Sequence, residues 1–127
     1  MGKIRGIRGA TTADENTKEA IVEATKDMLE ALVKANNIDS DDIASAMFTT
    51  TRDLTAEFPA VAARKHLGWN FVALMCGHEM DVPDAQPNCI RVSVLVNTNK
   101  RGDEIINVYL KDAANLKQRG IIASNNS

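Results

Sequence analysis

The sequence predicts an α/β (α+β) fold in which helices pack on a mixed five-stranded sheet. One long amphipathic helix, one shorter helical stretch and one strictly alternating strand carry this prediction. Along the chain the order is strand, helix, strand, helix and then three strands, which is typical of a sheet with helices packed on one face. The chain has 127 residues, the size of one domain, and contains no internal repeat.

The first two elements are a strand that contains glycines and a long amphipathic helix. Residues 4–12 favour a strand, and Gly6 and Gly9 would let a packed element approach its backbone closely. A helix is expected over residues 17–35, begun by an Asn-Thr pair suited to its N-cap. Its apolar residues recur at helical spacing and its charged residues take the opposite face, so this helix should cover the sheet.

The middle of the chain predicts a strand, a short helix and another strand. Residues 43–50 favour the second strand. Pro59 suits the first position of a helix that continues through alanine-rich sequence, and Gly68 suits the position just after its end. Residues 70–76 favour the third strand, and the proline-containing stretch 81–88 is expected to be a loop.

The clearest strand covers residues 89–98. Its side chains alternate between two faces, so one face should be buried and the other exposed. The apolar face consists of Ile90, Val92, Val94 and Val96, and the other face consists of Arg91, Ser93, Leu95 and Asn97. A fifth strand or extended segment is expected over residues 105–110, followed by a loose, flexible tail over residues 118–127.

Composition and charge exclude several functional classes. With 15 basic and 17 acidic residues the net charge is -2, and aromatic residues make up only 4%, so a nucleic-acid partner is not expected. No apolar run reaches the roughly 18 residues of a membrane span. No signal peptide is expected from the first residues, and two cysteines do not suggest a disulfide framework. A cytoplasmic location without membrane association is therefore expected.

Four arginines lie on or near predicted strands and the second helix: Arg5, Arg8, Arg64 and Arg91. If they converged, their guanidinium groups would bind carboxylates or phosphates. Each could instead be an ordinary solvated arginine. Arg91 fits that alternative least well, because it lies mid-strand among apolar residues where an unpaired charge is costly.

The remaining reactive side chains indicate no reaction by themselves. The segment from Cys76 to Asp81 offers four potential metal ligands, but their spacing fits no zinc motif, and no metal site is predicted. Cys76 paired with a histidine stays open as a nucleophile, although no feature selects it. Tyr109, the only tyrosine, is expected to pack its ring and hydrogen-bond its hydroxyl at a sheet edge. The residues thus predict an anion-binding site without a defined chemistry.

Residues 4–12 read Ile-Arg-Gly-Ile-Arg-Gly-Ala-Thr-Thr, which resembles the N-terminal motif of the monofunctional chorismate mutases of the trimeric α/β class. Further blocks match in the same order, and the resemblance spans residues 4–117 almost without gaps. Several collinear blocks are far more specific than one motif. These blocks are residues 53–54, 58–60, 68–69, 79–82, 89–92 and 108–110.

The resemblance implies an isomerase that converts chorismate to prephenate, on the route to phenylalanine and tyrosine, by a pericyclic rearrangement that needs no cofactor. It also implies a homotrimer whose sheets form a barrel-like core, with three active sites in clefts between subunits. Residues 1–117 would form the chorismate mutase domain.

The resemblance also assigns roles to individual residues. Arg8 matches the arginine that binds a substrate carboxylate, and Arg91 matches the one placed against the ether oxygen of the breaking bond. Glu79 matches the glutamate that accepts a hydrogen bond from the ring hydroxyl of the substrate, and Cys76 matches a residue near that hydroxyl. Tyr109 matches a tyrosine that contacts the substrate. Positions lining the cleft match Phe58, Ala60, Arg64, Leu74, Met75, Leu116 and Lys117. The stretch from Phe58 to Arg64 is expected to come from the neighbouring subunit.

Three positions depart from the family pattern. Val61 stands where some members carry lysine, Met75 where some carry threonine, and Lys117 where some carry arginine. Val61 removes a positive charge near the mouth of the cleft, and Lys117 keeps the charge but lacks the two-donor guanidinium of arginine. None of the departures changes the residues expected around the breaking bond. They therefore predict weaker capture of a dianion rather than loss of the reaction. A non-catalytic trimer that binds a small carboxylate is the alternative.

Overall fold

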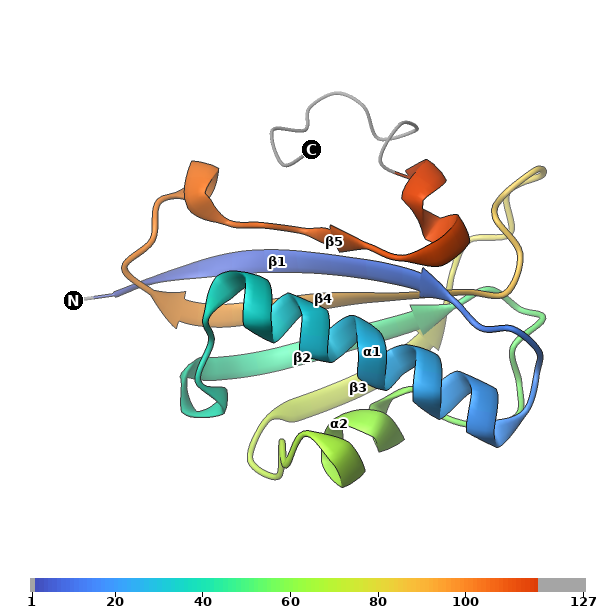
Figure 1. Cartoon of the computed structure of the whole chain (residues 1–127), viewed down its shortest axis with the longest axis horizontal. Coiled ribbons are helices and arrows are strands. Elements are labelled where there is room, and N and C mark those ends of the chain that lie inside the picture. Colours follow the sequence, from blue (N-terminus) through green and yellow to red (C-terminus); the bar gives the residue numbers. More distant parts are fainter. Residues whose placement is uncertain (1, 117–127) are drawn as a thin grey trace.

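The computed structural model describes residues 2–116 as a five-stranded sheet with two α-helices on one face (Figure 1). Of three short 3₁₀ helices in this part of the chain, two lie in connections and the third follows the last strand. The elements are β1 (Lys3–Thr12), α1 (Lys18–Asn36), β2 (Ile43–Thr50), α2 (Ala60–His66), β3 (Ala73–His78), β4 (Cys89–Thr98) and β5 (Val108–Tyr109). In the described part of the chain, no helix is long and apolar enough to cross a membrane.

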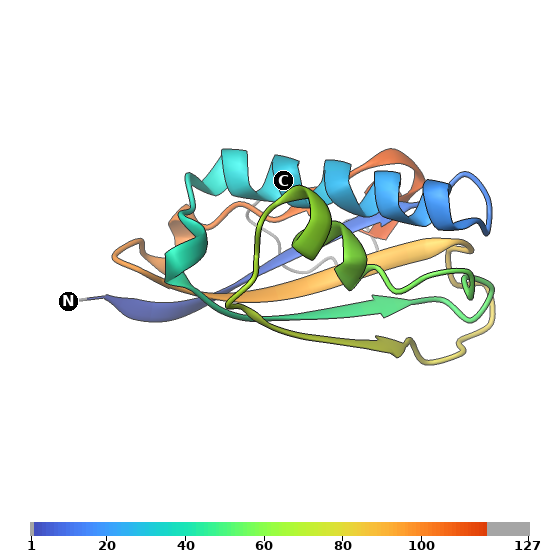
Figure 2. The same cartoon turned by 90° about the horizontal axis from the view of Figure 1, so that it is seen from below.

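The sheet is mixed, with the strand order β3-β2-β4-β1-β5. The central strand β4 is antiparallel to both of its neighbours, β1 and β2, and the two edge pairs, β2 with β3 and β1 with β5, are parallel. Figure 2 shows α1 and α2 together on one side of the sheet. The predicted fold class, a mixed five-stranded sheet packed by one long and one shorter helix, is confirmed.

Helix α1 has the cap and the buried face that its sequence predicts. The Thr17 side chain accepts a hydrogen bond from the Ala20 N–H at 3.1 Å, which satisfies one unpaired donor at the helix start. Asn37 ends the helix in the left-handed conformation, with a φ of 52°. The buried face of α1 packs on the apolar face of β4, and fully buried side chains include Ile21, Met28, Leu29, Leu32, Ile90 and Val94.

Two predicted strands have different bounds in the structure. The strand predicted over residues 70–76 begins only at Ala73, because the Asn70 N–H bonds back to the Gly68 carbonyl in a turn. The last strand, predicted over residues 105–110, pairs only at Val108–Tyr109. Just before it, the Asn36 side-chain amide bonds to both the N–H and the carbonyl of Ile106 at 2.8 Å. The Asn36 side chain takes the hydrogen bonds that a neighbouring strand would make with Ile106, so the pairing of β5 with β1 starts only at Val108.

Gly9 is a position where close approach requires glycine. A Cβ there would lie 3.2 Å from side-chain carbons of Met28 and Val92 and 3.3 Å from one of Leu32, so α1 packs directly on the β1 backbone. At Gly6, by contrast, the nearest atom to an added Cβ is 3.8 Å away, in ordinary contact. The expectation of close packing is therefore confirmed at Gly9 and wrong at Gly6.

Replacing Gly9 with alanine should lower the free energy of unfolding by about 1–3 kcal/mol, because the added methyl overpacks the helix–sheet contact. Urea denaturation of both proteins at one protein concentration measures the difference. An unchanged unfolding midpoint would contradict the close contact between α1 and β1.

The sheet face opposite the helices is called the open face here. It carries the outward residues of β4, such as Arg91 and Leu95, together with their cross-strand partners. Several of its apolar side chains are exposed: Ile4 is 59% exposed, Met75 64% and Leu95 40%. Exposed apolar surface of this kind is typical of a contact with another protein surface.

Candidate active site

The register of the sheet places side chains from four strands in one row across the open face. Ala10 of β1 pairs with both Tyr109 of β5 and Arg91 of β4, and Arg91 pairs with Thr49 of β2. Residues paired across strands point to the same face. Ala10 leaves room between the larger side chains of Arg91 and Tyr109. The row therefore brings a cation, a phenol and a hydroxyl to one end of the open face.

Glu79 joins this row from the end of β3. Thr49 pairs with Gly77, so Glu79, two residues further along, points to the same face as Thr49. The Glu79 N–H donates to the Thr50 carbonyl at 2.8 Å, which extends the β2–β3 pairing past the end of the strand. Parallel pairing thus fixes the backbone from which the carboxylate projects.

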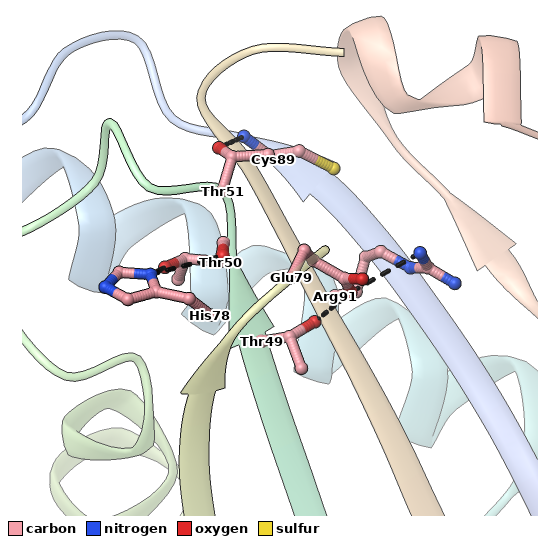
Figure 3. Close-up of polar contacts among 7 residues, drawn as sticks. All are labelled: Thr49, Thr50, Thr51, His78, Glu79, Cys89 and Arg91. Atoms are coloured by element: carbon pink, nitrogen blue, oxygen red, sulfur yellow. Dashed lines mark hydrogen bonds and ion pairs between the residues drawn. The ribbon is translucent and has the colours of Figure 1, made fainter. Parts of the chain in front are cut away.

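Arg91 and Glu79 form an ion pair, with Arg91 Nη1 3.4 Å from Glu79 Oε2 (Figure 3). The Thr49 hydroxyl donates a hydrogen bond to the same carboxylate oxygen. The Arg91 side chain is 45% exposed and that of Glu79 25%, so the pair is accessible from the open face. A charged side chain on an apolar strand needs a partner, and Glu79 is the partner of Arg91.

The pair faces a cavity of about 470 Å³ that is partly open to solvent. Of the residues predicted for the site, the cavity is lined by Arg8, Glu79, Arg91, Tyr109 and Leu116. Arg8 comes from β1, where its N–H donates to the Asn107 side chain at 2.8 Å. The cavity therefore combines two guanidinium groups, a carboxylate and a phenol with apolar wall residues, an arrangement suited to a small dianion that carries a hydroxyl.

Among the described residues, the other ones predicted for the site do not line this cavity. Phe58 precedes α2 and is 66% exposed, whereas Ala60 and Arg64 lie on α2, which packs on the covered face. Cys76 pairs with the buried Phe48, so it points away from Glu79. These residues form a second group around α2 and β3.

Within the second group, Cys76 lies beside α2. Burial raises the pKa of the Cys76 thiol, although a hydrogen bond with the Ala60 backbone and the nearby Arg64 guanidinium oppose this rise. Leu74 is partly buried against the core, and Met75 lies on the open face beside Met47. Lys117 and the predicted tail, residues 118–127, lie outside the described residues.

Sequence reasoning missed some residues of the cavity wall, chiefly Thr49 and Cys89. Cys89 is buried, and loss of solvation raises the pKa of its thiol to about 11. Since both thiols have raised pKa values, neither is an activated nucleophile at neutral pH. Thr49 belongs to the run Thr49-Thr50-Thr51 at the end of β2, and this was the only signal in the sequence. Among residues 2–116, no group of three or more His, Cys, Asp or Glu side chains is placed to hold a metal ion.

Comparison with known proteins identifies the family of the chain. The model of the family described as chorismate mutase type I matches residues 4–119. The chain is 41% identical over 114 residues to chorismate mutase AroH of Bacillus subtilis, covering 90% of both chains. It is 44% identical over 115 residues to chorismate mutase AroH of Thermus thermophilus, covering 90% of this chain and 93% of the relative.

The fold has a solved counterpart as well. A chorismate mutase structure from Clostridium thermocellum superimposes with a TM-score of 0.84 at 47% identity, covering 87% of this chain and 97% of that one. The family match spans nearly all of the described chain, including the strands that carry Arg8, Arg91 and Tyr109 and the segment after β3 that carries Glu79. The chain therefore belongs to the chorismate mutase type I family.

Proposed function

We propose that this chain catalyses the rearrangement of chorismate to prephenate in the cavity around Arg91. The observation that carries the proposal is the Arg91–Glu79 pair, which faces an accessible cavity that Arg8 and Tyr109 also line. Chorismate has two carboxylates, a ring hydroxyl and an ether oxygen, and the cavity offers a matching set of donors and acceptors. Family membership supports the reaction, and the lining of the cavity supports the choice of residues.

The reaction is intramolecular, so the protein needs to supply position and electrostatic stabilisation rather than a nucleophile or a cofactor. The carbon–oxygen bond of the ether breaks while a carbon–carbon bond forms, and the substrate must be held in the compact conformer that brings these two carbons together. As the bond breaks, the ether oxygen gains negative charge. The Arg91 guanidinium, fixed on β4, would stabilise that charge more in the transition state than in the ground state.

The other residues of the cavity would orient the substrate. Arg8 would bind a carboxylate with its planar set of donors. The Glu79 carboxylate would accept a hydrogen bond from the ring hydroxyl and would also balance positive charge that develops on the ring fragment. Tyr109 lies at the β5 end of the row, whereas Glu79 lies at the other end, beyond Arg91. Tyr109 would therefore contact the substrate from the side opposite to Glu79.

We further propose that the functional unit is a homotrimer with each site shared between two copies. The open face carries exposed apolar side chains, which a barrel-like core of three sheets would bury. Phe58, Ala60 and Arg64 lie outside the cavity of their own chain, so a neighbouring copy could bring them to its open side. This arrangement would complete an anion site that one chain leaves open.

Purified protein incubated with chorismate tests the proposed reaction. We expect the absorbance of the enolpyruvyl group to decay several orders of magnitude faster than in buffer, with prephenate as the product. A decay no faster than the spontaneous reaction would contradict the proposal. Calorimetric binding of a prephenate-like dicarboxylate in such an inactive protein would instead support a carboxylate-binding module.

A further inference from the structure

We propose that Thr49 is a positioning residue for the reaction, because it holds the Glu79 carboxylate in place and keeps it from closing fully onto Arg91. This inference rests on the proposed function. It concerns a residue that neither the arginine pattern nor the matching sequence blocks singled out. The observation behind it is the hydrogen bond from the Thr49 hydroxyl to Glu79 Oε2.

The position of Thr49 in the sheet suits this task. Thr49 lies on β2, between β4, which carries Arg91, and β3, which ends just before Glu79. It pairs with Arg91 on one side and with Gly77 on the other. Its hydroxyl therefore reaches Glu79 from a paired, regular strand. Glu79 itself follows the end of β3 and precedes Met80, which is 78% exposed. A long carboxylate side chain in such a segment has several rotamers available unless a neighbour selects one.

The contact also changes how Glu79 meets Arg91. A strong charge-assisted N–H to carboxylate bond is about 2.7–2.9 Å long and is often bidentate for arginine. Here the Arg91 Nη1 to Glu79 Oε2 distance is 3.4 Å, longer than such a bond. The Thr49 hydroxyl binds the oxygen that would otherwise move toward the guanidinium. Donors of Arg91 thus stay available for the ether oxygen of the substrate.

The same contact selects the oxygen that meets the substrate. Thr49 and Arg91 both approach Oε2 of Glu79. Oε1 is then the oxygen that accepts from the ring hydroxyl. Without the Thr49 hydroxyl, the Glu79 carboxylate would rotate toward Arg91. Arg91 would then stabilise the charge on the ether oxygen less well, and Glu79 would orient the substrate ring less well.

The test compares Thr49→Val with Thr49→Ser in the chorismate assay, with circular dichroism and native mass as checks on folding and assembly. Valine keeps the shape but removes the hydroxyl, so kcat should fall about tenfold or more while KM changes less. Serine restores the hydroxyl and should keep kcat within about threefold of the parent. A serine variant as slow as the valine variant would overturn the inference even if the latter folded poorly.

Thr50→Val is the matched control. It removes a hydroxyl from the next residue of β2, whose Oγ1 lies 3.2 Å from His78 Nδ1 rather than near Glu79 (Figure 3). Loss of this buried hydroxyl should lower stability but leave kcat within about twofold of the parent. An equal loss of kcat in Thr50→Val and Thr49→Val would show a general effect of β2 and would overturn the inference.

A double-mutant cycle identifies the partner through which Thr49 acts. In a Glu79→Ala background, Thr49→Val should change kcat by less than about twofold, because the carboxylate it positions is gone. Independent, additive losses would overturn the inference. A parent protein without chorismate mutase activity would overturn the proposed function and this inference together, whereas an active parent with a fully active Thr49→Val variant would overturn the inference alone.

Discussion

Replacing Arg91 with alanine should reduce kcat for chorismate at least about a hundredfold, equivalent to about 3 kcal/mol or more of lost transition-state stabilisation. The reason is that the Arg91 guanidinium is fixed mid-strand at the cavity, where the proposed reaction builds negative charge on the ether oxygen. Interactions that strengthen only in the transition state appear in kcat, so KM should change less than kcat. Initial rates from chorismate absorbance give both constants.

Two further variants separate charge from other effects of the Arg91 substitution. Arg91→Lys keeps the charge but loses the planar fork, so its rate should lie between those of the parent and the alanine variant. Arg101→Ala is the control, because Arg101 is 78% exposed, pairs with Asp103 and lies away from the cavity. Its activity should be unchanged. An Arg91→Ala protein that keeps its kcat would refute the role given to Arg91.

Replacing Arg64 with alanine should reduce kcat/KM about 10–100-fold, the usual worth of a hydrogen bond to a charged group. This result would not be expected from one chain alone, because Arg64 lies on α2 and does not line the cavity around Arg91. The loss would follow from the proposed shared site, in which Arg64 of a neighbouring copy would contact the substrate. The same absorbance assay measures it, with native mass to show that the assembly persists. Full activity of Arg64→Ala would contradict that contribution.

Local patterns in the sequence were sufficient for the central elements of the fold. The alternation of β4 and the amphipathic spacing of α1 each describe a face that is buried in the structure. The bounds of β5 could not be predicted, since they depend on the Asn36 amide, which is 70 residues away in sequence from the Ile106 backbone it binds. An interaction of that kind leaves no periodic pattern.

The candidate site was less predictable from the residues alone than the central elements of the fold. The residues alone indicated four arginines, but they could not separate Arg8 and Arg91, which line the cavity, from Arg5, whose Nε donates to the Lys100 carbonyl. The family resemblance made that distinction and added Glu79 and Tyr109. Thr49 was missed because its proximity to Glu79, 30 residues along the chain, depends on the β2–β3 register.

Mixing two impaired variants tests directly whether the site combines Arg91 of one copy with Arg64 of another. Chains with Arg91→Ala and chains with Arg64→Ala would be unfolded together in equal amounts, refolded and assayed with chorismate. If copies assort at random in a trimer, about one quarter of the sites receive both arginines. The activity of the mixture is therefore expected to return to about that fraction of the activity of the parent. Activity no higher than the average of the separately refolded variants would contradict a site shared between copies.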